Sequence, residues 1–381
     1  MRPDRSSSTF SPQEYARYSR HIIIPEFGLD GQEALKKARV LVIGSGGLGS
    51  PSLLYLAAAG VGHIGIVDFD TVDDSNLQRQ VLFSTDDIGK GKAAQAQKRL
   101  QRLNPYIDVV IHETRLDRTN ARELIRQYDI VADGTDNFPT RYLVNDACVL
   151  EGKVNVYASI FQFEGQVSVF NYLNADGTRG PNYRDIFPEP PPPGLVPNCS
   201  EGGVLGVLPG IIGSMQALEV IKVITGVGEP LAGRLFLFDA SSFHTRFLNI
   251  RRNEAVRIEE LIDYQQFCGL DIPEAPVVEV SVHEMEEWRR QGEPFQLIDV
   301  REPYEYAIAQ IGGELMPVGQ IASFLPRISR DRKVIVHCRS GVRSARAIRE
   351  LQSLDHFDNL FNLKGGILAY SREIDQSVPQ Y

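Results

Sequence analysis

The strongest constraint on the fold is a short apolar run that leads directly into a glycine-rich turn. Residues 39–43 are β-branched and apolar, and residues 51–59 have the composition of a helix. Between them stands Gly44-Ser45-Gly46-Gly47-Leu48-Gly49. This Gly-x-Gly-x-x-Gly spacing lets the backbone approach a phosphate and directs the N–H groups of a helix start toward it. The pattern predicts a strand, a phosphate-binding turn and a helix, with a plain tight turn as the alternative.

Strands and helices alternate along the rest of the first 250 residues. Helical spacing marks residues 92–103, 120–128 and 211–225. Apolar runs that predict strands are found at 64–67, 108–111, 130–132, 154–159, 166–170 and 234–239. Such alternation predicts an α/β fold with a Rossmann-like, doubly wound sheet that is covered by helices on both faces. We expect the strand at 166–170 to run antiparallel and the strand at 234–239 to be the last.

Length and charge bound the domain number and the partners. At 381 residues the chain predicts a disordered tail at 1–14, a large domain at 15–250, a linker at 251–277 and a small α/β domain at 278–381. The net charge of −9 argues against nucleic acid as the main partner. No apolar run approaches the roughly 20 residues that span a bilayer. Four scattered cysteines and a start without a signal peptide indicate free thiols and a cytoplasmic protein.

Polar residues after the glycine turn fit phosphate chemistry. Asp68 ends the second strand, where a carboxylate can accept hydrogen bonds from a ribose. Asn76, Arg79 and Lys92 can hold a triphosphate, and Asp136 can hold Mg²⁺. Taken singly, Arg79 could be a surface ion pair and Asp136 a helix N-cap. A dinucleotide-dependent oxidoreductase would explain the glycines and Asp68, but it would leave Arg79, Lys92 and Asp136 without a role.

These residues belong to a set of motifs that resembles the MoeB/ThiF adenylyltransferases, relatives of the ubiquitin-activating enzymes. The motifs are Arg17-Tyr18-Ser19-Arg20-His21, the glycine turn, Asp68-Phe69-Asp70, Ser75-Asn76-Leu77-Gln78-Arg79-Gln80 and Thr135-Asp136-Asn137. The resemblance implies that ATP, with Mg²⁺, adenylates the C-terminal Gly-Gly carboxylate of a small ubiquitin-fold sulfur carrier of the MoaD/ThiS type. It implies a nucleotide site made of Gly44, Gly46, Gly47, Gly49, Asp68, Asp70, Ser75, Asn76, Arg79, Lys92, Asp136 and Asn137, with Mg²⁺ on Asp136.

Two further residues gain roles from the resemblance. Arg20 falls on an arginine that reaches into the partner subunit's site in the family, which implies a homodimer. Cys199 stands in Asn-Cys-x-Glu-Gly-Gly after a proline-rich crossover at 187–197. It matches a mobile-loop cysteine that forms a thioester or an acyl disulfide in some relatives. A partly buried thiol is the alternative for Cys199.

One family feature is missing from the sequence. Relatives bind structural zinc through two Cys-x-x-Cys pairs, but this chain reads Pro181-Asn182-Tyr183-Arg184-Asp185 at the first place and has no cysteine at 251–257, the second. Asn182 and Asp185 do not replace soft thiolate ligands in a tetrahedral zinc site. We therefore expect no structural zinc, and we expect packing or hydrogen bonds to hold this region.

A second anion cradle is centred on Cys338. A strand at 333–337 is followed by Cys338-Arg339-Ser340-Gly341-Val342-Arg343 and a helix at 344–352. Backbone N–H groups of such a loop point inward over a helix N-terminus. With two arginines nearby, the loop is expected to favour a thiolate and to stabilise a persulfide anion. A buried inert cysteine is the alternative.

The second domain resembles the rhodanese family. It has Ile298-Asp299-Val300-Arg301-Glu302-Pro303-x-Glu305-Tyr306, the six-residue loop of sulfurtransferases and a closing Gly365-Gly366-Ile367-Leu368-Ala369-Tyr370. One departure is Gln310-Ile311-Gly312-Gly313, where His-Ile-x-Gly-Ala is more typical, and this puts local packing in doubt.

The order of the two domains resembles MoeZ-type fusion proteins. It implies that persulfide sulfur on Cys338, supplied by a cysteine desulfurase or thiosulfate, attacks the acyl adenylate to give a thiocarboxylate, with Cys199 as the candidate reducing thiol. Adenylation alone, with sulfur from another protein, is the alternative. The sequence leaves open whether the product feeds molybdenum cofactor, thiamine, cysteine or tRNA thiolation.

Overall fold

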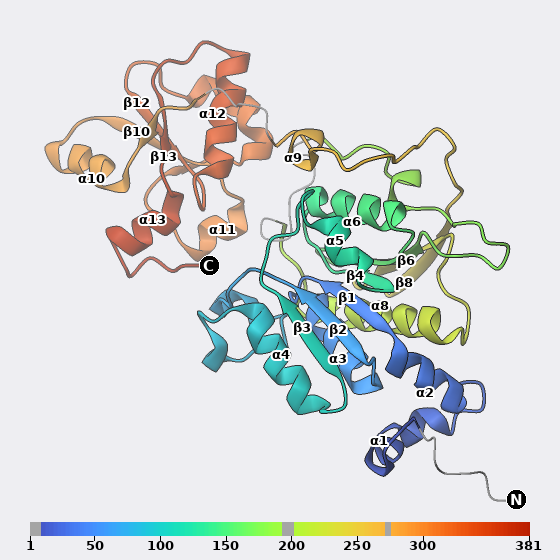
Figure 1. Cartoon of the computed structure of the whole chain (residues 1–381). Helices are drawn as coiled ribbons and strands as arrows, with labels where there is room; N and C mark the ends of the chain where they lie inside the picture. The colour runs from blue at the N-terminus through green and yellow to red at the C-terminus, as the bar shows by residue number, and fades with distance from the viewer. Residues whose placement is uncertain (1–8, 193–201, 271–275) are drawn as a thin grey trace, which may run out of the picture. The chain divides into compact units, whose positions relative to one another are not determined.

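The computed structural model describes residues 9–192, 202–270 and 276–381, and the chain forms two compact units, Met1–Ile272 and Pro273–Tyr381. Each unit is an α/β body (Figure 1). The division lies inside the linker expected at 251–277, and the residues up to 270 belong to the first unit.

The first unit is built on an eight-stranded sheet. Its order is β3-β2-β1-β4-β5-β6-β7-β8. The strands are β1 (Arg39–Ile43), β2 (His63–Val67), β3 (Asp108–His112), β4 (Ile130–Asp133), β5 (Val154–Phe161), β6 (Glu164–Phe170), β7 (Arg234–Asp239) and β8 (His244–Asn249). The five strands β1 to β5 run parallel to one another. The strands β6, β7 and β8 each pair antiparallel with the strand before them. The predicted doubly wound sheet and its antiparallel sixth strand are confirmed.

Helices cover both faces of this sheet (Figure 1). They are α1 (Pro12–Ile22), α2 (Gly28–Lys37), α3 (Gly49–Ala59), α4 (Lys92–Leu103), α5 (Ala121–Arg126), α6 (Phe138–Leu150), α8 (Leu208–Thr225) and α9 (Tyr264–Phe267), with short 3-10 turns η2 (Asp74–Asn76), η3 (Thr85–Asp87) and η4 (Tyr183–Asp185). Alternate residues of β1 point to opposite faces. Val40 and Val42 pack with α3, α4 and α8, whereas Leu41 and Ile43 pack with α5 and α6.

Helix α8 is the most apolar of the long helices. Among the described residues it is the one helix long and apolar enough to cross a membrane by length and composition. In the structure it packs against α3, β5 and β6, and Ile212, Ala217 and Val220 are buried. Its apolar character is therefore explained by its place in the core.

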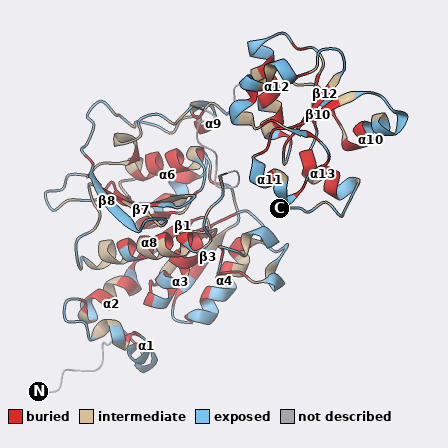
Figure 2. Cartoon of the chain, turned by 180° about the vertical axis from the view of Figure 1, so that it is seen from behind, coloured by how far each residue is buried: buried red, intermediate tan, exposed pale blue. Residues whose placement is uncertain are grey.

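The last strand, β8, was not predicted from the sequence. Every residue of β8 is exposed, and the strand is drawn pale blue at the edge of the sheet in Figure 2. It pairs with β7 on one side only. An edge strand with no buried face has no alternating apolar pattern, so the sequence carries no signal for it.

Residues 9–14 belong to the disordered tail predicted at 1–14, but the structure describes them packed on the first unit. Ser11 caps α1 through a capping box, in which its hydroxyl accepts from the Glu14 N–H and the Glu14 carboxylate accepts from the Ser11 N–H. Phe10 is buried, and the Nζ of Lys36 lies 2.6 Å from the Glu14 carboxylate. These contacts fix residues 9–14 on the first unit, so the prediction of a tail was wrong for them.

The second unit is a parallel sheet with the order β11-β10-β12-β13-β9. Its elements are β9 (Glu279–Val280), α10 (Val282–Gln291), β10 (Phe295–Asp299), α11 (Pro303–Ile308), β11 (Glu314–Leu315), η5 (Val318–Arg327), β12 (Lys333–His337), α12 (Val342–Leu354), β13 (Leu360–Leu363) and α13 (Gly366–Glu373). The predicted strands at 297–300 and 333–337 and the helix at 344–352 correspond to β10, β12 and α12.

Candidate active sites

A pocket of about 670 Å³ lies at the carboxyl ends of β1, β2 and β4 in the first unit. The chain leaves β1 toward β2 on one side, whereas β4 lies on the other side of β1, so the pocket marks the switch point where doubly wound sheets bind ligands. The predicted site residues that line it are Gly44, Gly46, Gly47, Asp68, Asp70, Arg79, Lys92, Asp136 and Asn137.

The glycine turn is held in one shape by its own backbone and by Asp68. Gly44 has φ +85°, a conformation that favours glycine, and a Cβ on Gly49 would lie 1.9 Å from the Gly44 carbonyl oxygen. The Asp68 carboxylate accepts from the N–H of Ser45 at 2.8 Å and from its hydroxyl at 2.7 Å. The turn therefore has a fixed shape, and its backbone N–H groups are available to bind phosphate oxygens.

Two cations lie on the cradle side of the pocket. The Lys92 side chain is buried, and its Nζ lies 3.2 Å from an Asp70 carboxylate oxygen. Arg79 donates to the Ser75 carbonyl oxygen at 3.0 Å, and within the described ranges it makes no ion pair. Arg79 is thus not held by the surface ion pair that was the alternative for it.

Asp136 is exposed at the pocket and is not the N-cap of α6. The side chain of Asn137 caps this helix by accepting from the Thr140 N–H at 3.0 Å. Among the described residues, the Asp136 carboxylate receives only a long hydrogen bond from the Asn137 side chain, at 3.4 Å. A hard carboxylate oxygen is thus left facing the pocket, which is the kind of ligand that Mg²⁺ prefers.

Some predicted site residues lie outside the pocket lining. Gly49 acts within the turn, and Ser75 and Asn76 form η2, where the Asn76 side chain accepts from the Asp73 N–H at 3.2 Å. Arg20 is exposed near the end of α1. Cys199 lies outside the residues that the structure describes.

The pocket also contains residues that sequence reasoning missed. Gln80 and Arg141 line it, and both are at least nine-tenths buried. The Oε1 of Gln80 and the Nε of Arg141 have no hydrogen-bond partner among the described residues. The only sequence signals were that Gln80 follows Arg79 and that Arg141 stands one helical turn after Asn137.

The place where zinc pairs were missing is held by hydrogen bonds. Asp185 accepts from the N–H of Asn182 at 2.7 Å and, across 68 residues, from the N–H of Asn253 at 2.8 Å. No cluster of three or more potential His, Cys, Asp or Glu ligands occurs in the described parts of the chain. Asp185 thus connects residues 181–185 with residues 251–257, the two places where the sequence lacks a cysteine pair.

A buried ion pair fixes residues 251–270 to the first unit. Arg184 donates to the Asp146 carboxylate through two nitrogens, and the Tyr264 hydroxyl donates to the same group at 2.8 Å. The Arg184 guanidinium also lies over the Phe267 ring, 4.5 Å from its centroid. This segment, which the sequence predicted as linker, is therefore anchored by long-range contacts.

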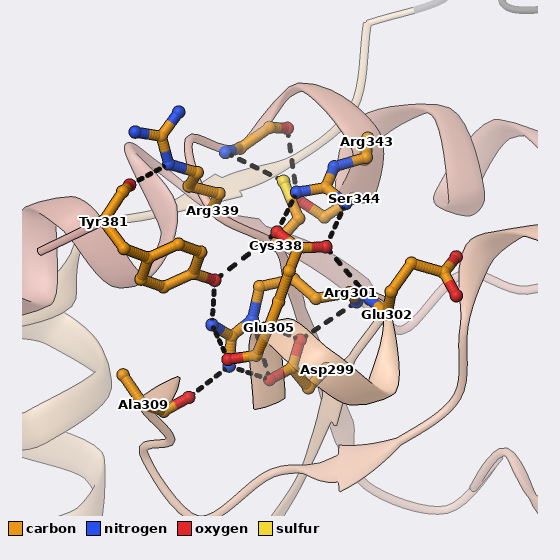
Figure 3. Close-up of polar contacts among 11 residues, drawn as sticks. Asp299, Arg301, Glu302, Glu305, Ala309, Cys338, Arg339, Arg343, Ser344 and Tyr381 are labelled. Carbon is orange, nitrogen blue, oxygen red and sulfur yellow. Dashed lines mark hydrogen bonds and ion pairs between the residues drawn. The ribbon is translucent and has the colours of Figure 1, made fainter. Parts of the chain in front are cut away.

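The Cys338 loop joins β12 to α12 and presents donors to the sulfur (Figure 3). The Gly341 N–H donates to the Sγ of Cys338 at 3.1 Å, and the Ser344 hydroxyl lies 3.5 Å from it. Gly341 itself has φ +96°. Cys338 is 1% exposed. The thiol is thus buried, as the inert alternative requires, but it lies in a loop that donates hydrogen bonds to sulfur.

The N-terminus of α13 fixes the back of this loop. The N–H groups of Ile367 and Leu368 donate to the carbonyl oxygens of Cys338 and Arg339 at 3.0 and 3.1 Å. A Cβ on Gly366 would lie 2.4 Å from the Cys338 carbonyl oxygen, so only glycine fits there. These hydrogen bonds fix the two carbonyl groups toward α13. The Gly341 N–H of the same loop is directed toward the sulfur.

The two arginines of the loop are both engaged (Figure 3). Arg343 forms two hydrogen bonds to the Glu305 carboxylate, at 2.6 and 2.7 Å, and Arg339 donates to the main-chain oxygen of Tyr381. Burial opposes ionisation of Glu305, but its hydrogen bonds lower the pKa of this carboxyl below the ordinary value. Because Glu305 neutralises the charge of Arg343, the loop has less positive charge to offer an anion. This suits a singly charged sulfur anion better than a phosphate dianion.

The unusual Gln310–Gly313 segment is held by the burial of Ile311 and by hydrogen bonds to its backbone. Ile311 is buried, its carbonyl accepts from Arg289 at 3.2 Å, and the Tyr306 hydroxyl donates to the Gly313 carbonyl at 3.0 Å. A Cβ on Gly313 would lie 3.2 Å from the Nε2 of His337. The missing alanine therefore leaves space that the histidine before Cys338 fills.

Comparisons with known proteins identify a family for each of the two units. The ThiF family model matches residues 18–258, and the rhodanese-like domain model matches residues 281–373. "Probable adenylyltransferase/sulfurtransferase MoeZ" of Mycobacterium tuberculosis is 49% identical over 98% of this chain and 97% of that protein. "Sulfur carrier protein adenylyltransferase" of Thermus thermophilus is 53% identical over 68% of this chain and 99% of that protein.

A solved structure shares the fold of the first unit. The crystal structure of E. coli MccB with ATP is 23% identical, has a TM-score of 0.55 and covers 67% of this chain and 75% of that chain. These matches leave the oxidoreductase alternative without support. The chain belongs to the ThiF family and carries a rhodanese-like domain in its second unit.

Proposed function

We propose that the chain uses ATP to adenylate the C-terminal Gly-Gly carboxylate of a small ubiquitin-fold sulfur carrier and then transfers persulfide sulfur from Cys338 to it. One observation carries the proposal. A single chain holds a glycine cradle with cations at a pocket of about 670 Å³ and a cysteine whose sulfur accepts a backbone N–H in a six-residue loop. The full-length relatives named as adenylyltransferase/sulfurtransferases support the pairing of the two activities.

The first step needs positioning and charge neutralisation more than a base. The carrier carboxylate is already an anionic nucleophile at neutral pH. Its oxygen attacks the α-phosphorus of ATP, and the bond to pyrophosphate breaks. Lys92 and Arg79 offset the charge on the departing pyrophosphate, and the glycine turn holds phosphate oxygens with N–H groups. Asp136 would hold Mg²⁺, which would add positive charge at the phosphates.

The second step transfers sulfur. A cysteine desulfurase or thiosulfate supplies the outer sulfur of a Cys338 persulfide. This sulfur attacks the carbonyl carbon of the acyl adenylate, a C–S bond forms, and AMP leaves with the electron pair of the broken C–O bond. A second thiol then attacks the Cys338 sulfur of the acyl disulfide, which releases the thiocarboxylate and leaves a disulfide on the enzyme. Cys199 is the proposed second thiol.

The assembly we propose is a cytoplasmic homodimer. Arg20 is exposed near the end of α1 and does not line the pocket of its own chain, as suits a residue that serves a partner's site. Cys148 and Cys268 are unpaired and buried, and burial raises the pKa of Cys268 to about 11. Unreactive free thiols suit a reducing compartment.

The test separates the two activities in one variant. Cys338→Ala is incubated with ATP, thiosulfate and a purified carrier that ends in Gly-Gly. We expect normal ATP–pyrophosphate exchange and no sulfur-for-oxygen exchange in the carrier by mass spectrometry. Cys268→Ala, which changes a buried thiol outside both sites, is the control and should behave as wild type. Full thiocarboxylate yield from Cys338→Ala would favour the alternative in which another protein supplies the sulfur.

A further inference from the structure

Arg141 is a buried cation in the wall of the nucleotide pocket. It stands in α6, lines the pocket and is 8% exposed. Its guanidinium lies near three aromatic rings, with distances to the centroids of 5.6 Å for Phe138, 5.3 Å for Tyr157 and 6.0 Å for Tyr183. These rings fix the plane of the guanidinium and keep water from most of it.

The hydrogen bonds of Arg141 leave part of its donor capacity unused. Its Nη2 donates to the Thr135 carbonyl at 3.1 Å and to the Ser159 hydroxyl at 3.0 Å, but its Nε has no partner in the described residues. Both acceptors are neutral. A guanidinium has five N–H donors, so Arg141 can donate to a further acceptor without losing these contacts.

Arg141 also lacks a carboxylate partner, unlike the other arginines with little exposed side chain. Arg184 pairs with Asp146, Arg301 with Asp299 and Arg343 with Glu305. Arg141 makes no ion pair within 4.0 Å in the described ranges.

Asp133 is the nearby acid and attracts Arg141 electrostatically, but no ion pair within 4.0 Å joins the two side chains in the described residues. The Asp133 carboxylate accepts from the N–H and hydroxyl of Thr135, and burial raises its pKa. A buried cation without a counter-ion is costly. An anion bound in the pocket would remove that cost.

We propose that Arg141 binds the C-terminal carboxylate of the carrier, which rests on the proposed function. The phosphate side of the pocket is already supplied by the glycine turn after β1, by Lys92 and by Arg79. Arg141 is held instead by Ser159 near the end of β5, two strands from β1 in the sheet. Strand spacing puts these two ends roughly 10 Å apart, which leaves room for a nucleotide and a peptide end.

The pocket continues from Arg141 toward the connection between β5 and β6. Ile160 and Val204 line this part, and Val204 pairs with Gln162 in that connection. An extended Gly-Gly end can enter here because it has no side chains. Arg141 then donates to one carboxylate oxygen through an N–H group that Thr135 and Ser159 do not use, and the other oxygen attacks the α-phosphorus. Once that bond forms and pyrophosphate leaves, the carboxylate charge is gone.

The test compares two carriers on two enzymes. One carrier ends in the free Gly-Gly carboxylate and the other in Gly-Gly carboxamide, and both are titrated in the presence of an ATP analogue with a methylene between the α- and β-phosphorus. A charge-assisted hydrogen bond predicts that the wild type prefers the carboxylate by about 10- to 100-fold. In Arg141→Gln the preference should fall to below about threefold. Affinity for the ATP analogue alone should not change.

Matched variants keep the result interpretable. Arg141→Lys should keep an intermediate preference, because it retains the charge and loses the planar group that Thr135 and Ser159 orient. Arg122→Gln, which removes a surface arginine paired with Glu151, should keep the full preference. If Arg141→Gln fails to fold, Ser159→Ala tests the proposal instead. It removes one acceptor that orients Arg141, so it should reduce the preference for the carboxylate carrier.

Two outcomes would overturn the proposal. One is an unchanged carboxylate preference in the folded Arg141→Gln protein, or in Ser159→Ala and Arg141→Lys together. The other is a loss of ATP-analogue affinity with the preference intact, which would make Arg141 a phosphate ligand. Failure of the proposed function itself would look different, because wild-type protein would then show no carrier-dependent ATP–pyrophosphate exchange.

Discussion

His337, the residue before Cys338, should make the rhodanese unit sensitive to acid. Its side chain is fully buried, and neither ring nitrogen has a hydrogen-bond partner among the described residues. Burial lowers the pKa of His337 from 6.5 to about 4, although Asp299, whose carboxylate is 3.6 Å away, acts in the opposite direction. The perturbation we choose is His337→Leu, which removes the titrating ring without breaking a hydrogen bond.

The sign and size of the effect follow from proton binding. Between the two pKa values the unfolded chain binds a proton that the folded chain does not, so the unfolding free energy decreases as the pH falls through this window. The difference between a pKa of 6.5 in the unfolded chain and about 4 in the folded chain corresponds to a loss of roughly 3 kcal/mol of unfolding free energy at a pH well below both values. About 2.5 kcal/mol of this should be lost between about pH 7 and about pH 4.5.

Trp288 gives a direct assay. It is the single tryptophan of the chain and lies in α10 of the second unit, so its fluorescence reports the unfolding of that unit. Urea unfolding of the full chain at both pH values should show a smaller loss of stability in His337→Leu than in wild type, by about 2.5 kcal/mol. His356→Asn, at an exposed histidine of the same unit, is the control. Equal losses in His337→Leu and wild type would refute the reasoning.

Three further predictions concern the scaffold of the two sites. Asp146→Ala should reduce the unfolding free energy by about 3–5 kcal/mol, because it leaves a buried arginine unpaired, and neither added zinc nor a chelator should change the Tm of either protein. Gly49→Ala should abolish ATP–pyrophosphate exchange because its Cβ would overlap a carbonyl of the turn, whereas Gly210→Ala, with open space around it, should retain the activity. Gly366→Ala should reduce sulfur transfer from thiosulfate but not adenylation, and Gly319→Ala, also in open space, should affect neither. A normal rate in Gly49→Ala or Gly366→Ala would show that the corresponding backbone can relax.

The parts of the fold that could be predicted are those with local causes. The β-branched run of β1 and the spacing of α4 are set by neighbouring residues, and both elements have the predicted bounds. The capping box at Ser11 is also local, because Ser11 and Glu14 stand three residues apart, and it indicates where α1 begins. The strand β8 has no buried face, so no pattern marked it.

The parts of the sites that could not be predicted depend on residues distant in sequence. Glu305 meets Arg343 across 38 residues, and Tyr264 meets Asp146 across 118. No motif indicates that Arg141 would be the buried arginine without a carboxylate. These contacts depend on how helices and strands pack together, and the spacing of residue types along the sequence does not determine that packing.

The hydrogen bonds between α13 and the Cys338 loop have a consequence for the order of synthesis. The loop, residues 338–343, leaves the ribosome before α13, yet its two carbonyl oxygens find their donors only in α13. A nascent chain that has reached α12 therefore carries a cysteine whose cradle is unfinished. Under the proposed function, we therefore expect a chain that ends before α13 to adenylate carriers but not to load sulfur on Cys338, because the loop would lack the donors that fix its backbone.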